Sequence, residues 1–390
     1  MKEDNMKQGW EVKKLGEVCE VIGGSTPKTN ESTYWDGNYF WVTPAELDGT
    51  KLISSTKRTI TEAGVKSAHL QLLPAGTVLL SSRAPIGKVA ITTVPMYCNQ
   101  GFKNLICSDK LYNCYAYWFL YANTEYLNAL GTGATFKEIS KKVVEQIPIP
   151  VPPLPVQEQI VSELDLLSGI IEKKREQLKE LDALAQSIFY DMFGDPITNE
   201  KGWEVKKLGE EFNISSGGTP DTKNTLYWDG GNISWIGSNL CRNEIIYKND
   251  GKYITDSGLS NSSAKIYQEG YVLVALVGAT IGKVSLLKFQ TATNQNVAGI
   301  NVPQNIGYTS EFIFYLIQNL YELFMSIGDG KFKMANLSFI RSLPLLSPPL
   351  PLQRQFASKI EAIERQKEQI KQSISETETL FNARMQHYFG

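Results

Sequence analysis

The stretch W-E-V-K-K-L-G-E occurs twice in this chain of 390 residues, at residues 10–17 and again at residues 203–210. The second copy begins 193 positions after the first. Such a spacing is far longer than the 20–50 residues of solenoid repeats and is typical of a duplicated domain. A chain of this length also exceeds one ordinary hydrophobic core. The sequence therefore predicts two similar halves.

Further matched segments follow the octet in the same order in both halves. They are G-S-T-P with G-G-T-P (24–27 and 217–220), Y-W-D-G (34–37 and 227–230), I-G-K-V (86–89 and 281–284), N-Q (99–100 and 294–295), F-K (136–137 and 332–333), P-P-L-P (152–155 and 348–351) and F-G (193–194 and 389–390). The offset grows only from 193 to 196, so small insertions separate the halves.

Each half consists of two parts with different sequence patterns. Residues 1–150 and 203–346 are rich in Gly, Thr, Tyr and Val, with short apolar runs between turn residues, such as 77–80 and 272–277. This pattern predicts mostly β globular domains. A short apolar, aromatic stretch in each half, at 116–122 and 312–317, predicts one added helix.

The remaining segments, residues 151–202 and 347–390, predict one long helical spacer each. Prolines at the start of each segment favour a break before the helix. Apolar residues then recur in steps of three and four, which is a heptad pattern. The predicted pairing residues are Leu164, Leu167, Ile171, Leu178, Leu181 and Ile188 in the first helix, and Ile360, Ile363, Ile370, Ile374 and Phe381 in the second.

Two such helices, joined through an intervening globular domain, most simply pair as an antiparallel coiled coil. A helix of about 35–40 residues is about 50–60 Å long. Lys174 and Lys367 interrupt the apolar pattern, and polar residues at such positions help to fix register. The alternative is that each helix packs only on its own β domain. The predicted fold class is α+β, with a two-fold internal repeat.

Composition excludes several classes of protein. The five cysteines are scattered without a C-x-x-C motif and only His69 and His387 are present, so we expect neither a disulfide framework nor a metal site. We find no apolar run long enough for a membrane span and no secretory signal at the start, and expect a cytoplasmic protein. The formal net charge is −2, so nucleic-acid binding would need local patches.

The doubled order of these motifs resembles the specificity (S) subunit of type I restriction–modification systems. The resemblance covers nearly the whole chain. It includes S-S-R-A-P-I-G-K-V (81–89), N-Q-G-F (99–102), I-P-x-P-x-P-P-L-P-x-Q-x-Q (147–159) and F-Y-D-M-F-G-D-P (189–196). The second half departs from the first, with V-G-A-T at 277–280 where we align S-R-A-P at 82–85, and N-V at 296–297 for G-F at 101–102.

The resemblance implies a non-catalytic subunit that binds double-stranded DNA. Residues 1–150 and 203–346 would be target-recognition domains, each reading one half of a split DNA site. The paired helices would set the gap between half-sites and dock two methyltransferase (M) subunits, with restriction (R) subunits completing the complex. S-adenosylmethionine, ATP and Mg²⁺ would be bound by those partners and not by this chain. The repeated octet would have a structural role.

Residues that could contact DNA are polar side chains expected on loops of the two domains, because base edges and phosphates are recognised by such groups. They are Lys28, Thr43, Glu46, Arg83, Lys88, Asn99, Gln100, Lys103 and Lys137 in the first domain, and Ser238, Asn239, Lys283, Asn294, Gln295, Asn296, Lys331 and Lys333 in the second. Arg83 is the preferred single base contact, since its counterpart in the second half is not basic. Lys88 and Lys283 are expected to contact phosphates or to be ordinary surface residues. The tyrosine–tryptophan pairs are expected to be part of the core.

Three enzyme-like signals are incomplete. The stretch G-A-T-I-G-K-V at 278–284 has one residue too few between its glycines for a phosphate loop and lacks the Ser or Thr after lysine. The S-P-P-L at 347–350 lacks the aromatic residue that would hold a flipped base. A glycine-rich S-adenosylmethionine loop is also missing. Two alternatives stay open, a DNA-modifying enzyme with an unrecognised active site and a coiled-coil scaffold that binds proteins.

The charge of the segments indicates that partners are needed. Residues 10–150 hold 14 basic and 12 acidic side chains, whereas residues 156–195 hold four basic and nine acidic ones. Since phosphate neutralisation supplies much of the affinity for DNA, domains this neutral are expected to bind weakly alone. The acidic helix is suited to protein docking, with residues 172–176 on its outer face.

Overall fold

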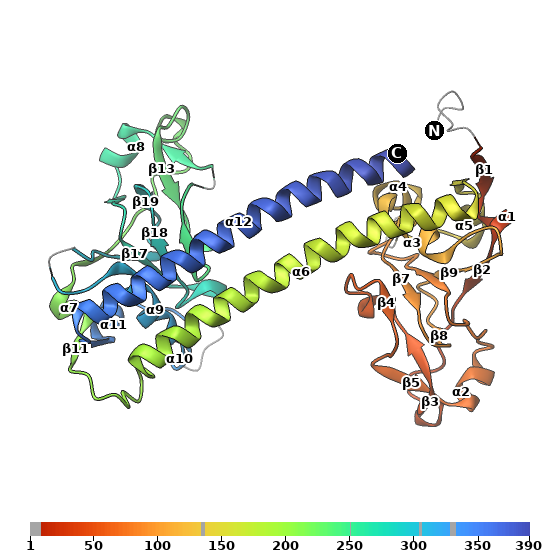
Figure 1. Cartoon of the computed structure of the whole chain (residues 1–390), viewed down its shortest axis with the longest axis horizontal. Helices are drawn as coiled ribbons and strands as arrows, with labels where there is room; N and C mark the ends of the chain where they lie inside the picture. The colour runs from red at the N-terminus through yellow and green to blue at the C-terminus, as the bar shows by residue number, and fades with distance from the viewer. Residues whose placement is uncertain (1–8, 134–136, 250, 304–305, 328–332) are drawn as a thin grey trace. The chain divides into compact units, whose positions relative to one another are not determined.

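The computed structural model describes residues 9–133, 137–249, 251–303, 306–327 and 333–390. The chain forms two compact units. The first comprises Met1–Arg175 and Gln372–Gly390, and the second comprises Glu176–Lys371. Each unit therefore holds one globular half together with part of both long helices (Figure 1). Within the described ranges, no helix is long and apolar enough to cross a membrane.

The repeated octet joins the beginning of each globular domain to its end. In the first unit it forms β1 (Glu11–Lys14) and α1 (Leu15–Val18), and β1 pairs antiparallel with β10 (Pro148–Val151). In the second it forms β11 (Val205–Lys207) and the start of α7 (Leu208–Glu211), and β11 pairs with β21 (Pro344–Leu346). The leucine that follows each strand is fully buried. The octet thus has the structural role predicted for it.

The first globular domain holds two main sheets whose strands are not consecutive in sequence. The five-stranded sheet has the order β2 (Cys19–Gly23), β9 (Lys103–Cys107), β6 (Val78–Leu80), β7 (Val89–Thr92) and β4 (Leu52–Ile53). The three-stranded sheet has the order β5 (Arg58–Ile60), β3 (Trp35–Val42) and β8 (Tyr97–Cys98). Within the larger sheet, β4 and β7 run parallel, and the other neighbours run antiparallel.

The second domain repeats this topology strand for strand and adds one short strand. Its five-stranded sheet has the order β12 (Ile214–Ser216), β20 (Val297–Ile300), β17 (Val272–Ala275), β18 (Val284–Leu287) and β14 (Glu244–Ile246). Its four-stranded sheet has the order β15 (Tyr253–Ile254), β13 (Ile233–Ile236), β19 (Thr291–Thr293) and β16 (Ile266–Tyr267). The predicted duplication of a β-rich domain is therefore confirmed in the fold.

One aromatic helix in each domain packs against the larger sheet. The predicted aromatic helices are α3 (Asn113–Ala122) and α9 (Ser310–Asn319), and each buries six consecutive residues against the sheet. The other helices are α2 (Glu62–Ser67), α4 (Thr124–Leu130) and α5 (Lys141–Glu145) in the first domain, and α8 (Asp256–Ser260), α10 (Tyr321–Met325) and α11 (Leu337–Ser342) in the second.

Both predicted spacers are continuous helices of 40 residues, α6 (Leu154–Phe193) and α12 (Leu350–Phe389). Each begins directly after a Pro-Pro pair, and a further proline lies in its first turn. Proline is tolerated there because the N–H groups of the first turn have no hydrogen-bond partner within the helix. Figure 1 shows both helices without a break.

Within each unit the two helices contact each other in antiparallel order. In the first unit Glu163 pairs with Arg384 at 2.8 Å, and Arg175 further along α6 pairs with Glu378, which precedes Arg384 on α12. In the second unit Asp182 pairs with Lys367 at 2.8 Å. The ring centroid of Phe189 lies 5.7 Å from that of Phe356, so the order is again reversed. The predicted antiparallel pairing is confirmed.

The predicted seam residues differ in how deeply they are buried. Those in the N-terminal half of each helix are buried: Leu164, Leu167, Ile171, Ile360 and Ile363. The others are half-buried: Leu178, Leu181, Ile188, Ile370, Ile374 and Phe381. The alternative of helices packed only on their own domains does not hold. The core of each domain includes residues of both helices, namely Leu164 and Phe389 in the first and Phe189 and Phe356 in the second.

The tyrosine–tryptophan pairs have the structural role expected of them. Trp35 packs edge-to-face on Trp41 with ring centroids 4.9 Å apart, and Trp228 packs on Trp235 in the same way at 5.2 Å. The indole nitrogens of Trp35 and Trp228 each donate to a backbone carbonyl in the preceding loop.

Candidate nucleic-acid interface

Parallel pairs of strands bring the candidate loops of each domain to one sheet edge. In the first domain Val42 at the end of β3 lies opposite Cys98 at the end of β8. The loops that follow carry Thr43 and Glu46 on one side and Asn99 and Gln100 on the other. In the second domain β13 and β19 end together, and their loops carry Ser238, Asn239, Asn294, Gln295 and Asn296. The topology thus gathers residues predicted separately from the sequence.

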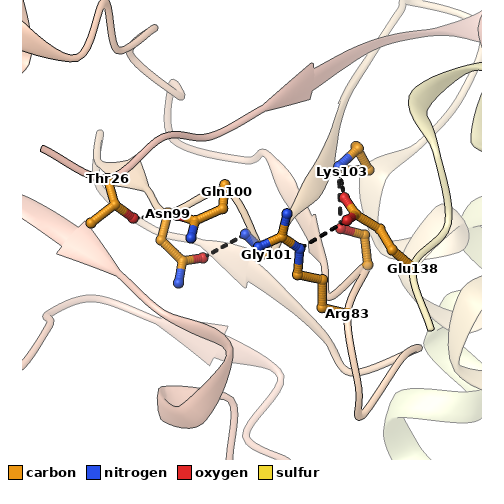
Figure 2. A network of polar contacts seen from close by, with 8 residues as sticks. Thr26, Arg83, Asn99, Gln100, Gly101, Lys103 and Glu138 are labelled. Carbon is orange, nitrogen blue, oxygen red and sulfur yellow. Dashed lines mark hydrogen bonds and ion pairs between the residues drawn. The ribbon is translucent and has the colours of Figure 1, made fainter. Parts of the chain in front are cut away.

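The Asn-Gln loops have the same internal hydrogen bonds in both domains. The Asn99 amide oxygen accepts the backbone N–H of Gly101 at 2.9 Å, and that of Asn294 accepts the N–H of Asn296 at 3.0 Å. The hydroxyl of Thr26 donates to the amide oxygen of Gln100 (Figure 2). In the second domain the hydroxyl of Thr219 donates to the amide oxygen of Gln295 at 2.6 Å. Both glutamines are exposed, and the bonds fix them at the tip of each loop.

Thr43 and Glu46 stabilise their own loop. A carboxylate oxygen of Glu46 accepts the backbone N–H and the hydroxyl of Thr43, each at 2.8 Å. The other oxygen accepts the backbone N–H of Lys57 at 2.7 Å. Both oxygens of Glu46 are therefore engaged within the loop, which gives this side chain a structural role.

Arg83 and Lys103 converge on one carboxylate, that of Glu138 (Figure 2). The Nε of Arg83 donates to one oxygen of Glu138 at 2.9 Å, and the Nζ of Lys103 donates to the other at 3.1 Å. Lys103 also donates to the hydroxyl of Ser82 at 3.3 Å. The backbone N–H of Ser82 donates to the Gly101 carbonyl, which places this cluster next to the Asn-Gln loop.

The cluster keeps Glu138 charged. Burial by itself raises the pKa of Glu138, but the hydrogen bonds from Lys103 and Arg83 and their positive charges outweigh burial and lower it below its ordinary value. The result is a positively charged group of three side chains with its arginine outermost, since the side chains of Arg83 and Lys103 are 45% and 14% exposed.

The remaining lysines differ in exposure, and one of them lies outside the described residues. Lys28 and Lys137 are exposed, and Lys88 and Lys283 are half-buried at matched positions. The Nζ of Lys333 donates to the backbone carbonyl of Met325. Lys331 lies outside the described residues.

The backbone corrects our alignment of the two halves around Arg83. Ser82 N–H donates to the Gly101 carbonyl, and in the second half it is Leu276 whose N–H donates to the Asn296 carbonyl. Ser82 thus corresponds to Leu276, and Arg83 to Val277 instead of Gly278. The extra residue of the second half lies after this point, within 278–280, where the first half has a cis Ala84–Pro85 bond. The counterpart of Arg83 is still not basic.

The whole charged cluster is replaced by apolar side chains in the second domain. The isolated bridge between Arg83 and Glu138 corresponds to the bridge between Val277 and Met334. Lys103 lies opposite Gly23 in β2, and Ala298 lies opposite the matching Ser216 in β12. Val277, Ala298 and Met334 thus occupy the positions of Arg83, Lys103 and Glu138.

Sequence reasoning missed Glu138, Val277 and Met334. The three members of the charged cluster are separated by 20 and 35 positions in sequence, and no local pattern links them. Glu138 and Met334 each directly follow the matched F-K pair, at 136–137 and 332–333. The match therefore aligned these two residues, but it did not indicate that they belong to the site.

Comparisons with known proteins agree with this architecture. The family model described as type I restriction modification DNA specificity domain matches residues 7–182 and again residues 200–378. The chain is 31% identical over 377 residues to the type I restriction enzyme MjaIX specificity subunit of Methanocaldococcus jannaschii, covering 91% of this chain and 86% of that one. It is 32% identical over 162 residues to the EcoR124I/EcoR124II specificity subunit of Escherichia coli, covering 40% of each.

Solved structures share the fold. The type I restriction–modification S subunit from M. genitalium superposes with a TM-score of 0.61 at 14% identity, over 100% of this chain and 98% of that one. A chain from a study of complex assembly and conformational transition of the type I system also gives 0.61, at 18% identity over 99% and 98%.

The family match confirms the duplication predicted from the repeat and the non-catalytic role implied by the resemblance. The two matched regions are the two halves of the repeat, and relatives named specificity subunits agree with a recognition subunit that is not itself an enzyme. The chain belongs to the specificity-subunit family of type I restriction–modification systems and carries two of its specificity domains.

Proposed function

We propose that this chain reads a split DNA site, with one half-site bound by each domain. The observation that supports this most strongly is the matched pair of loop edges. Their hydrogen-bonding framework is the same in both domains. The charged cluster beside the first loop is replaced by apolar side chains in the second domain. Two domains that recognise different base sequences need the same backbone framework with different polar and apolar side chains on it.

Reading by the loops is also supported by their chemistry. Gln100 and Gln295 are exposed amides held in place by a threonine, and such amides pair with the adenine edge in the major groove. Lys137 and the lysines at matched positions 88 and 283 are suited to phosphates.

We further propose that the long helices dock two methyltransferase subunits and that restriction subunits join the complex through them. Residues 156–195, which include most of α6, hold nine acidic and four basic side chains. This net negative charge supports protein docking over DNA contact, because phosphates would be repelled by it. In this proposal the partners bind S-adenosylmethionine, ATP and Mg²⁺, and this chain supplies the recognition surface alone.

The docking proposal is tested by measuring DNA affinity with and without the partner. A fluorescent duplex carrying the recognised site is titrated with the pure chain and with the chain co-purified with its methyltransferase, at physiological salt. We expect weak binding by the chain alone and much tighter binding by the complex. Nanomolar binding by the chain alone would contradict the need for a partner, and tight binding of S-adenosylmethionine by the pure chain would favour the enzyme alternative.

A further inference from the structure

One backbone position carries opposite chemistry in the two domains. In the first domain it is the bridge between Arg83 and Glu138, and in the second the bridge between Val277 and Met334. The residue after each bridge is anchored in the same way. Ile139 N–H donates to the Ser82 carbonyl at 2.9 Å, and Ala335 N–H donates to the Leu276 carbonyl at 2.8 Å. The two sites therefore have the same backbone bridge and the same anchoring hydrogen bond, and they differ in side chains.

In the first domain the side chains aim an arginine outward. Glu138 holds the Nε of Arg83, and Lys103 neutralises the second oxygen of Glu138. Among the described residues, the two terminal nitrogens of Arg83 have no hydrogen-bond partner. These nitrogens have the spacing that a bidentate contact with O6 and N7 of guanine needs.

In the second domain the same site presents a hydrocarbon and thioether surface. Met334 is 67% exposed, which is high for a large apolar side chain, and Val277 beside it is half-buried. Ala298 takes the place of Lys103 and is fully buried. In the major groove the one apolar group among the base edges is the methyl group of thymine.

We propose that this matched position sets base choice in both half-sites: Arg83 binds guanine in the first, and Met334 with Val277 contacts a thymine methyl group in the second. Glu138 is a positioning residue that fixes the guanidinium of Arg83. This inference rests on the proposed function, and it goes further by naming the position, the residues and the base chemistry.

Glu138 acts by reducing the freedom of the arginine. An arginine side chain loses rotamer entropy when it is held in one geometry at a binding surface. The bond from Nε to Glu138 fixes that geometry before DNA arrives, so less free energy is lost on binding. Because Lys103 is nearly buried, Glu138 itself is anchored from the side of the sheet.

The proposed contact of Arg83 with guanine is tested by selecting sequences from a random duplex library. The selection uses the full chain in complex with its methyltransferase. Wild type is expected to select guanine at one position of the first half-site, and Arg83→Met to reduce that preference about tenfold or more. Glu138→Gln is expected to reduce it about threefold at the same position only. A merely structural role for Glu138 would instead weaken every position of that half-site equally.

Matched controls separate base reading from loss of charge or fold. Lys110→Met removes one positive charge from an exposed loop of the same domain and should leave the selected motif unchanged. The second half-site serves as an internal control for folding, since each Arg83 or Glu138 variant should still select it fully.

The proposed contact of Met334 and Val277 with thymine is tested by replacing thymine with uracil, which removes only the methyl group. In duplexes substituted at each thymine of the second half-site in turn, wild type should lose affinity about threefold or more at one position. Met334→Ser should bind the thymine and uracil duplexes equally at that position. Equal wild-type affinities at every position would overturn the thymine contact.

The outcomes distinguish this inference from the proposed function. If the wild-type complex selects no split motif, the proposed function fails. If it selects one and Arg83→Met leaves every base preference of the first half-site unchanged, the motif stands and the inference about Arg83 is overturned.

Discussion

Gln157 and Gln353 show how single residues fix this fold. They occupy matched positions, three residues into each long helix, and are fully buried. The Gln157 amide donates to the carbonyls of Lys110 and Pro152 at 2.9 and 2.8 Å and accepts the N–H of Tyr112 at 2.8 Å. Gln353 makes the three equivalent bonds in the second domain. Each glutamine therefore joins the helix start to the proline hinge and to the loop before α3 or α9.

Gln157→Ala is expected to lower the free energy of unfolding by about 2 kcal/mol or more, because it leaves buried backbone groups without partners. Urea denaturation followed by circular dichroism measures the change. Gln159→Ala, two residues along and exposed, is the control and should change stability by less than about 0.5 kcal/mol. Equal effects of the two variants would contradict the role of Gln157.

Glu138 gives a pH dependence whose direction follows from its lowered pKa. A carboxyl group with a folded-state pKa below its ordinary value of 4.5 stabilises the fold above that value, and the contribution is lost as the pH falls through the folded-state pKa. The difference in unfolding free energy between wild type and Glu138→Gln should therefore be largest near neutral pH and shrink in acid. A difference that grows as the pH falls would show that Glu138 is not paired as described.

For single residues, the sequence indicates which side chains could belong to the site better than it indicates which residues they contact. Arg83, Asn99, Gln100 and Lys103 could be proposed because they are polar residues near turns. Glu138 could not, because the bridge that brings it to Arg83 spans 55 positions and depends on the finished sheet. Glu46 was proposed as a contact for the same reason, and its loop uses both of its oxygens.

Among the elements, the long helices break the internal symmetry at their polar seam residues. Lys174 donates to the hydroxyl of Ser373 in the first unit. Lys367 contacts Asp182 at 2.8 Å and Glu364 at 2.7 Å in the second. By the repeat, Lys174 corresponds to Ile370 and Lys367 to Ile171, so each lysine is unique to its helix. Burial alone would lower the pKa of Lys367, but its bonds to the two carboxylates raise it, so the lysine stays charged.

Lys367→Met is expected to lower the free energy of unfolding by about 3 kcal/mol, because it leaves the buried carboxylate of Glu364 unpaired. Adding Glu364→Leu should recover most of that loss, since a well-packed apolar pair is often as stable as a buried ion pair. Chemical denaturation of the two variants provides the measurement, and exposed Lys371→Met is the control. A double variant less stable than Lys367→Met would contradict this account.

The elements divide into those that local pattern predicts and those it does not. The heptad pattern and the prolines predict α6 and α12 closely, because a helix is specified by neighbours in sequence. Apolar runs at 77–80 and 272–277 likewise become β6 and β17. The order of strands in each sheet could not be predicted, because 79 residues of chain separate β2 from β9, with which it pairs.

For the whole molecule, the repeat gives one chain two recognition domains joined by two helices that each contribute to both units. Because the two strands of a duplex run antiparallel, two similar domains can bind the two halves of a split site in opposite orientations, as the subunits of a dimer bind a palindrome. The proposed role of the helices is to set the gap between the half-sites.

Lengthening both helices by one heptad, after Arg175 and after Lys371, is expected to lengthen the gap in the recognised site. Seven helical residues add about 10 Å, or about three base pairs. Sequence selection on the lengthened complex measures the gap. Half-sites that change while the gap stays the same would contradict the role of the helices.

The most direct test of the central claim is sequence selection from a random duplex library by the full chain in complex with its methyltransferase. We predict one motif made of two different short half-sites with a fixed gap, in which Arg83→Met alters only the first half-site. A well-folded complex that enriches no motif, or only one uninterrupted site, would contradict the assignment of one half-site to each domain.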